Sequence, residues 1–474
     1  MANSSPLDLG TERTGRLLRK YAVPAIIAMT ASSLYNMVDS IFIGQGVGAL
    51  AISGLAVTFP LMNLSTAFGT LVGVGASTMI SILLGQKNYG QARKVLGNVV
   101  SLNILIGILF MAATLAFLDP ILYFFGASEN TLPYARQYIE IILYGNAITH
   151  VYFGLNSALR ASGNPKMAMG LTLFTVIFNT ILDPLMIFEF GFGIRGAAWA
   201  TVISQTIAMI VTVVYFCNRK RFLHFGKGVL KIDVKVASES MAIGFGPFLM
   251  HSAACLVTLF INQQTRRYFG DLGIGAYGIC NRIVFMFGMI CLGLNQGMQP
   301  IAGYNFGARK YTRVRKVYRT AVKYATLITT ACFVTSVFLP RYAVSMFTSD
   351  PELTALAENG LRLMNIVFPI VGFQMISTNF FQSLGMVRQS VFLSLSRQIL
   401  CLIPMLYLLP MWFGPNGVWI SFPVSDFISF AITLVMIAQL MRKFSRLNDG
   451  DDPALAGIQE TVRRTMPANQ TEKR

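Results

Sequence analysis

The sequence predicts an all-α membrane protein of twelve transmembrane helices in two pseudo-symmetric six-helix bundles. Three observations support this fold class: an apolar composition, twelve long apolar segments and an internal repeat. Hydrophobic residues make up 54% of the 474 residues and charged residues only 12%, about half the charged share of a soluble domain. The apolar residues recur with a helical period, unlike the alternating ten-residue segments of an outer-membrane barrel.

Twelve segments are long enough to cross a bilayer, which takes about 20 residues of helix. The first is full length and lacks a small-residue cleavage site, so we interpret it as a span rather than as a cleavable signal peptide. Six spans fall in each half of the chain, at residues 20–44, 52–84, 95–117, 137–160, 167–188, 194–217, 240–265, 273–304, 319–339, 358–384, 390–412 and 416–441.

The two halves carry the same landmarks at a separation of 222 residues. The run GQKNY at 85–89 falls on GARKY at 307–311. A repeat that keeps its register over so long a stretch indicates two copies of one architecture, which in membrane proteins usually enclose a site between them. Further matching pairs are Gly75 with Gly297, Phe125 with Phe347, Gly163 with Gly385 and, with one residue added to the separation, Pro24 with Pro247.

The net charge of +18 follows membrane topology rather than a nucleic-acid site. If both termini lie on one side, that side also holds Lys87 and the basic clusters at 219–235 and 309–323. This positive-inside bias predicts a multi-pass membrane protein with both termini in the cytoplasm. The basic face also suits contact with anionic lipid headgroups. The outer side carries only Arg136, Arg195, Arg266, Arg267, Arg341 and Arg362.

Five regions follow from the pattern of spans. Residues 1–19 form a cytoplasmic N-terminus, residues 20–217 the N-terminal six-helix bundle and residues 240–441 the C-terminal six-helix bundle. Residues 218–239 contain no apolar span and form a cytoplasmic linker. Residues 442–474 form a cytoplasmic tail that is polar and predicted to be disordered.

Ionisable residues inside the spans are costly in hydrocarbon and are therefore the candidates for function. Asp39 lies about 28 Å from the cytoplasmic end of the first span, and Asp183 lies about 24 Å into the fifth. Both are thus expected at nearly the same level in the outer half of the membrane. Tyr35 and Asn179 lie one turn below them on the same helix faces, and Thr201 of the sixth span reaches that level.

This expected cluster of two carboxyls, a phenol, an amide and a hydroxyl has two chemical interpretations. It could hold a small cation, with an extra oxygen from the Thr180 carbonyl, to which Pro184 cannot donate. It could also store a proton, because two carboxyls in a low-dielectric site can hold one proton between them. The simpler alternative is that each aspartate only bonds a neighbouring helix.

The second copy lacks this chemistry. In the Pro24–Pro247 register, Asp39 corresponds to Asn262, and the counterpart of residues 179–184 has no acid. Arg397 and Asp426 fall in the eleventh and twelfth spans, where they are expected to form a structural polar pair, with transported-ion chemistry as the alternative. The N-terminal bundle is therefore the predicted ion-handling half.

Seven short stretches, in this order along the spans, carry a resemblance to known transporters: VDSIFIG (38–44), LGQK (84–87), ALRASGNPK (158–166), NTILDP (179–184), ATVISQ (200–205), SRQ (396–398) and FPVSD (422–426). Over residues 15–445 the chain resembles the multidrug and toxic compound extrusion (MATE) family, and is most similar to its MepA-like bacterial branch.

The resemblance implies a protein of the bacterial cytoplasmic (inner) membrane, with a V-shaped pair of bundles that alternates between outward- and inward-facing states. It implies a secondary active transporter, not an enzyme, that exchanges H⁺ or Na⁺ for amphipathic, often cationic compounds and uses no cofactor besides the coupling ion. The expected partners are small drug or metabolite substrates and membrane lipid, with no nucleic acid, and the chain is expected to be a monomer. Tyr35, Asp39, Asn179, Asp183 and Thr201 match the family's cation and proton network, with Asp39, Asn179 and Asp183 as Na⁺ ligands where Na⁺ is the coupling ion.

Asn262 departs from the family branches that carry an acid in the C-terminal lobe, so their second ion site is not transferred here. A lipid-linked oligosaccharide flippase would need several basic residues in its cavity, whereas the spans offer only Arg282 and Arg397. A dedicated metabolite exporter would show the same sequence pattern as a drug exporter. The residues predicted to line the substrate cavity, where apolar side chains suit promiscuous binding, are Asn36, Met250, Phe260, Asn262, Met286, Met298 and Phe381.

Overall fold

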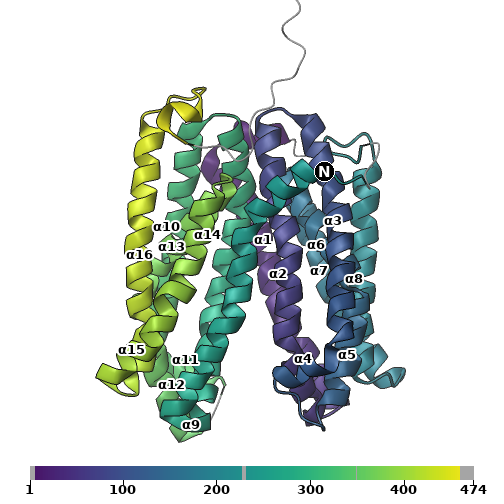
Figure 1. Cartoon of the computed structure of the whole chain (residues 1–474), viewed down its shortest axis with the longest axis vertical. Coiled ribbons are helices and arrows are strands. Elements are labelled where there is room, and N and C mark those ends of the chain that lie inside the picture. Colours follow the sequence, from purple (N-terminus) through teal and green to yellow (C-terminus); the bar gives the residue numbers. More distant parts are fainter. Residues whose placement is uncertain (1–5, 227–230, 348–349, 459–474) are drawn as a thin grey trace, which may run out of the picture.

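The computed structural model describes residues 6–226, 231–347 and 350–458, and every regular element in these ranges is a helix (Figure 1). The first half contains η1 (Pro6–Gly10), α1 (Thr14–Gly46), α2 (Ala49–Gly85), α3 (Tyr89–Ala116), α4 (Leu118–Phe124), α5 (Leu132–Tyr144), α6 (Asn146–Ala161), α7 (Pro165–Pro184), η2 (Leu185–Glu189) and α8 (Ile194–Cys217). The second half contains α9 (Val234–Gly307), α10 (Tyr311–Phe338), α11 (Pro340–Ser345), α12 (Pro351–Met364), α13 (Phe368–Ser383), α14 (Val387–Leu395), η3 (Ser396–Leu402), α15 (Ile403–Phe413), α16 (Asn416–Ser445) and η4 (Pro453–Ala456).

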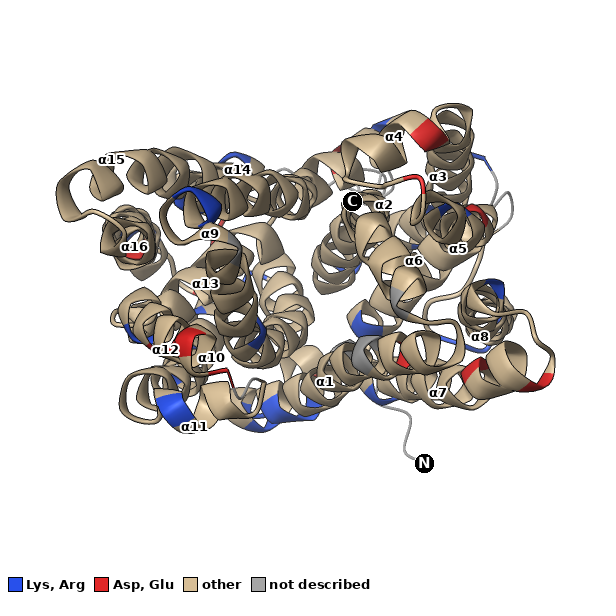
Figure 2. Cartoon of the chain, turned by 90° about the horizontal axis from the view of Figure 1, so that it is seen from below, with Lys and Arg blue, Asp and Glu red and all other residues tan. Residues whose placement is uncertain are grey.

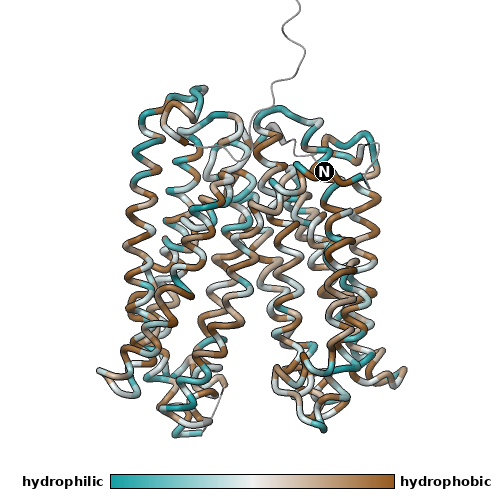
Figure 3. The backbone as a smooth tube through the Cα atoms, viewed as in Figure 1, coloured by the Kyte–Doolittle hydropathy of each residue, from teal (hydrophilic) through white to brown (hydrophobic). Residues whose placement is uncertain are grey.

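The helices form two bundles, α1 to α8 and α9 to α16, which lie side by side in the view along their axes (Figure 2). Figure 1 shows that the bundles meet at the end where α1 begins and α16 ends, and diverge toward the end that carries α4, α5, α11 and α12. We call these the terminal end and the opposite end. Apolar residues dominate the middle of the long helices, and polar residues gather at both ends (Figure 3). The prediction of an all-α membrane protein built from two helical bundles is therefore confirmed.

The number of single-helix spans is smaller than the twelve predicted. Within the described ranges, ten helices are long and apolar enough to cross a membrane, or eleven if the bent pair α12–α13 is one span. Gly270 (φ 65°, ψ −155°) divides α9 into two of these spans. The predicted fourth span is present as α5 and α6, of 13 and 16 residues, each too short alone for a core about 30 Å thick. α12 and α13 meet at 58° across a turn at residues 365–367, and Pro369 in the first turn of α13 has no N–H to donate back across this break.

The helix boundaries repeat with the separation seen in the sequence. α3 and α10, α6 and α13, and α8 and α16 each begin 222 residues apart. The turn before α3 and the turn before α10 each place a non-glycine residue in the left-handed region, at Lys87 (φ 60°) and Arg309 (φ 57°). The repeat in the sequence is thus also a repeat in the backbone.

Glycines let the two bundles approach closely in the terminal half of the molecule. A Cβ atom added to Gly244 of α9 would lie 1.8 Å from the carbonyl oxygen of Leu71 on α2. The repeat partners Gly75 and Gly297 also lie at this contact. A Cβ added to Gly75 would lie 2.0 Å from the Ser240 carbonyl oxygen, and one added to Gly297 would lie 2.5 Å from the Ala22 Cα. α1 and α2 therefore contact α9 backbone to backbone.

The three predicted regions outside the bundles, namely the N-terminus, the linker and the C-terminal tail, contain more regular or ordered structure than expected. α1 begins at Thr14, and α9 begins at Val234 with Asp233 as its N-cap, so helix replaces the end of the predicted linker 218–239. Segment 447–458 is ordered. Arg309 pairs with Asp452 at 2.8 Å, and Ile458 is buried in the large cluster of apolar side chains that also contains Tyr311 and Phe444, which we call the main core. Predicted disorder is therefore wrong for this segment, because it is fixed by contacts with the second bundle; residues 459–474 lie outside the described ranges.

Candidate functional site

Two aspartates from neighbouring helices lie together near the opposite end of the first bundle. Asp39 lies in the last turns of α1, and Asp183 is the penultimate residue of α7, which packs against α1. The two residues are only 5% and 0% exposed. Their carboxyl groups are close enough to interact electrostatically. A hydrogen bond between the two carboxyls would require one proton, since a carboxylate can only accept.

Three further side chains connect this pair to α8. With the Asn179 amide oriented so that both of its groups are satisfied, its nitrogen donates to the two Asp183 carboxyl oxygens at 2.8 and 3.2 Å. Its oxygen accepts from the backbone N–H and the hydroxyl of Thr201 at 2.9 and 3.1 Å. The Tyr35 hydroxyl lies 2.8 Å from Thr201 Oγ1. The structure thus brings together all five residues that the sequence placed in one site, including Asp39.

The helix is irregular next to the two aspartates. Pro184 ends α7 and has no N–H to donate to the Thr180 carbonyl. The chain continues as the π-helical turn η2, an irregularity frequent at functional sites. Asp39 Oδ1 is buried and has no hydrogen-bond partner within the described part of the chain. Because an unpaired buried acceptor is costly, this oxygen is suited to receive a proton or a cation.

A cavity of about 250 Å³ lies beside the cluster, inside the first bundle. Tyr35, Asn179 and Thr201 line one part of it. The other part is also polar, since Ser65 Oγ donates to the side-chain amide oxygen (Oδ1) of Asn146 and lies 3.1 Å from His150 Nε2. The cavity therefore joins the acidic cluster to hydrogen-bonding groups that a polar solute or water could use.

Sequence reasoning missed this second part of the cavity. Tyr138, which is 2% exposed and lies close enough to both aspartates to interact with them electrostatically, was not identified as a site residue. Tyr138, Ile142, Asn146 and Thr149 all line the cavity at helical spacing along α5 and α6. That stripe could have been recognised from its period of three to four residues. The signal is weak, however, because its polar members lie near the helix break at Gly145, where polar residues are also expected at the membrane–water interface.

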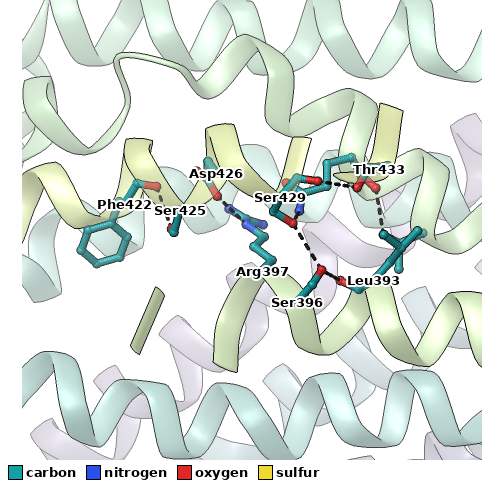
Figure 4. Close-up of polar contacts among 10 residues, drawn as sticks. Leu393, Ser396, Arg397, Phe422, Ser425, Asp426, Ser429 and Thr433 are labelled. Atoms are coloured by element: carbon teal, nitrogen blue, oxygen red, sulfur yellow. Dashed lines mark hydrogen bonds and ion pairs between the residues drawn. The ribbon is translucent and has the colours of Figure 1, made fainter. Parts of the chain in front are cut away.

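The polar pair predicted in the second bundle forms in the structure (Figure 4). Arg397 Nε in η3 donates to Asp426 Oδ1 on α16 at 2.7 Å, and Asp426 is buried. One turn further along α16, Ser429 lies 3.5 Å from the Ser396 hydroxyl and accepts from Gln374 on α13. These contacts tie η3, α13 and α16 together.

The residues predicted to line a substrate cavity do not gather in one place. The Asn36 side chain lies outside the described part of the structure, and none of the other six lines the cavity in the first bundle. Met298 and Phe381 are 0% and 2% exposed in the main core. Neither lines the cavity in the first bundle, so their place in a substrate cavity stays a prediction; helical spacing alone does not distinguish a cavity-facing side from a helix-packing side. Met286 is 56% exposed, and the remaining three, Met250, Phe260 and Asn262, are partly buried.

A duplicated bundle of membrane helices with a buried polar cluster beside a cavity is the architecture of a membrane transporter. The MatE family model matches residues 24–185 and 242–408, which cover both repeats. The chain therefore belongs to the MatE family and is a multi-pass membrane protein, and the resemblance seen in the sequence is confirmed.

Named relatives and solved structures agree with this family. The chain is 28% identical over 430 residues to the multidrug export protein MepA of Staphylococcus haemolyticus (strain JCSC1435), covering 91% of this chain and 94% of that protein. A structure of the MATE multidrug transporter DinF-BH is 32% identical, with a TM-score of 0.85 over 94% of this chain and 100% of that chain. The fold is also shared with a MATE transporter solved in an outward-facing conformation, at 20% identity, a TM-score of 0.87 and the same coverage of both chains.

Proposed function

We propose that this chain exports amphipathic, often cationic organic compounds in exchange for H⁺ by alternating access. The observation that carries the proposal is the buried Asp39–Asp183 pair beside a cavity in the first bundle. Acids inside membrane spans are rare because they are costly, and they commonly mark ion or proton pathways. The names of the relatives, a multidrug export protein and a multidrug transporter, support organic substrates.

Protonation of the pair would couple ion movement to helix movement. One shared proton permits the hydrogen bond between the two carboxyls, whereas its loss leaves two like charges in a low-dielectric site, where they repel. Asp39 belongs to α1, which also contacts α9 of the other bundle. A shift of α1 would therefore change both the cavity and the contact between the bundles. Na⁺ is the alternative coupling ion, because the same oxygens could surround it.

We also propose that the terminal end faces the cytoplasm. This end carries Lys87 and the basic residues at the start of α10, as the positive-inside rule requires. In this orientation the bundles diverge toward the outside, so the structure is outward-facing (Figure 1). The inward-facing state would then require the glycine contacts between α2 and α9 to separate.

The test is transport by the purified full-length protein in proteoliposomes. Ethidium and norfloxacin serve as probe substrates, with flux measured in the presence and absence of an imposed ion gradient. Gradient-driven flux of either compound supports the proposal. Absence of drug flux together with movement of a lipid-linked oligosaccharide across the bilayer would instead identify a flippase.

A further inference from the structure

A second cavity, of about 470 Å³, lies at the terminal end of the second bundle. Its walls are the first turn of α14, the last turns of α16 and the segment that follows η4, with one residue each from α9 and α13. The Asp39–Asp183 cluster lies in the first bundle and shares no lining residue with this cavity. The proposed export mechanism therefore does not account for it.

The lining of this cavity combines positive charge with an apolar wall. Arg388 and Lys443 line it, and its described lining contains no acidic residue. The Lys443 ammonium donates to the Gly457 carbonyl at 3.0 Å, which leaves two of its three N–H groups for a ligand. Phe381, Met386, Met436 and Leu440 supply the apolar side. This combination fits a ligand that is anionic at one end and apolar at the other.

The backbone adds to the positive potential. Met386 is the N-cap of α14 and makes no side-chain capping bond, so the first turn of this helix directs its N–H groups and positive dipole end toward the same region. Arg388 and Gln389 lie in that turn and line the cavity. Three sources of attraction for an anion, namely two side-chain cations and a helix N-terminus, therefore meet at one place.

The surroundings identify the source of the anion. On α16, Leu434 and Val435 are 46% and 57% exposed, and on α14 Phe392 is 44% exposed. Exposed apolar side chains on spanning helices face hydrocarbon, so the cavity lies where helices leave the acyl region. The terminal end also carries the basic clusters, which attract anionic lipids. We infer that this cavity binds an anionic phospholipid, with its phosphate at Arg388 and Lys443 and its acyl chains along α14 and α16.

The experiment measures lipid affinity of the purified full-length protein by native mass spectrometry, with dimyristoyl phosphatidylglycerol as probe and phosphatidylcholine and inorganic phosphate as separate arms. The double variant Arg388→Gln/Lys443→Gln should bind phosphatidylglycerol roughly thirtyfold more weakly. The matched control is Arg442→Gln/Arg446→Gln, which removes two cations from the same end of α16 but none from the cavity lining. Its affinity should equal that of the wild type.

Three results would overturn the inference. Equal losses in the two double variants would mean that only general surface charge attracts the lipid. Equal binding of phosphatidylcholine would mean that the cavity does not select an anion, and binding of inorganic phosphate as tight as that of the lipid would identify a soluble-anion site. If the double variant does not fold, Arg388→Gln alone gives the same comparison, because this side chain is exposed.

Discussion

The cost of burying an acid explains why several polar residues converge on Asp183. A buried charge is tolerated when it is hydrogen-bonded or neutralised, and Asp183 receives the Asn179 amide at 2.8 Å while lying beside Asp39. The four-residue spacings 35–39 and 179–183, together with equal depth, were sufficient to predict this cluster from the sequence. Tyr138 was not predictable in the same way, because a polar residue at the end of a span resembles an interfacial residue.

We expect Asp39→Asn to abolish export while the protein still folds and inserts. Asparagine has nearly the volume of aspartate but cannot take up or release a proton, so the cycle would lose a coupling group. The measurement is gradient-driven drug efflux in proteoliposomes, with the melting temperature of the purified variant checked beside it. The control is Asp119→Asn, an exposed acid paired with Arg136 on the surface, which should export normally. Normal efflux by Asp39→Asn would make Asp39 a structural residue only.

The two bundles are expected to be functionally unequal at the residue level. Asn262→Asp should not create a second ion site, because one acid there would lack the partner network that surrounds Asp183. Asp183→Asn should strongly reduce the stimulation of efflux by an ion gradient. Both variants and Asn262→Ala are measured in the same efflux assay. Full activity of Asp183→Asn together with loss on Asn262→Ala would move the ion site to the second bundle.

At the scale of helices, the sequence predicted where apolar segments lie but not where they break. The break at Gly145 and the bend before Pro369 divide two predicted spans, because local backbone geometry, rather than hydropathy, decides whether a helix continues. The repeated glycines were visible in the sequence, yet their function required the structure. Only the structure shows that Gly75 and Gly297 each contact the other bundle.

Gly244→Ala should separate the bundles at the terminal end. The added methyl would lie 1.8 Å from the Leu71 carbonyl oxygen, and overpacking of this kind costs about 1–3 kcal/mol. Spin labels on Lys166→Cys and Arg446→Cys, in a cysteine-free background, report the distance between the bundles and should show a longer-distance population. Gly288→Ala on the same helix is the control, because its methyl has no neighbour within 4 Å and it gains the same helix propensity. An identical distance distribution in both variants would contradict the expectation.

At the scale of the whole molecule, two equivalent backbones carry unequal chemistry. The duplicated helices give the chain two matching bundles joined by the α1, α2 and α9 contacts, about which they would move in the proposed alternating access. Only the first bundle contains a pair of buried acids within the described residues, whereas the second holds the Arg397–Asp426 pair, in which positive and negative charges already balance. Ion binding in one bundle would therefore act on the movement of both.

The coupling ion is the remaining property of the whole transport cycle, and we expect it to be H⁺. Two carboxyls as close as those of Asp39 and Asp183 can hold one proton between them, whereas Na⁺ would need coordination by the surrounding oxygens. The measurement is drug efflux in vesicles at fixed pH, with a sodium gradient imposed and the proton gradient collapsed by a protonophore. We expect no efflux above that of empty vesicles under these conditions and recovery when a pH gradient is imposed. Robust efflux driven by sodium alone would reject proton coupling, and would assign Asp39 Oδ1 and its neighbours to a sodium site instead.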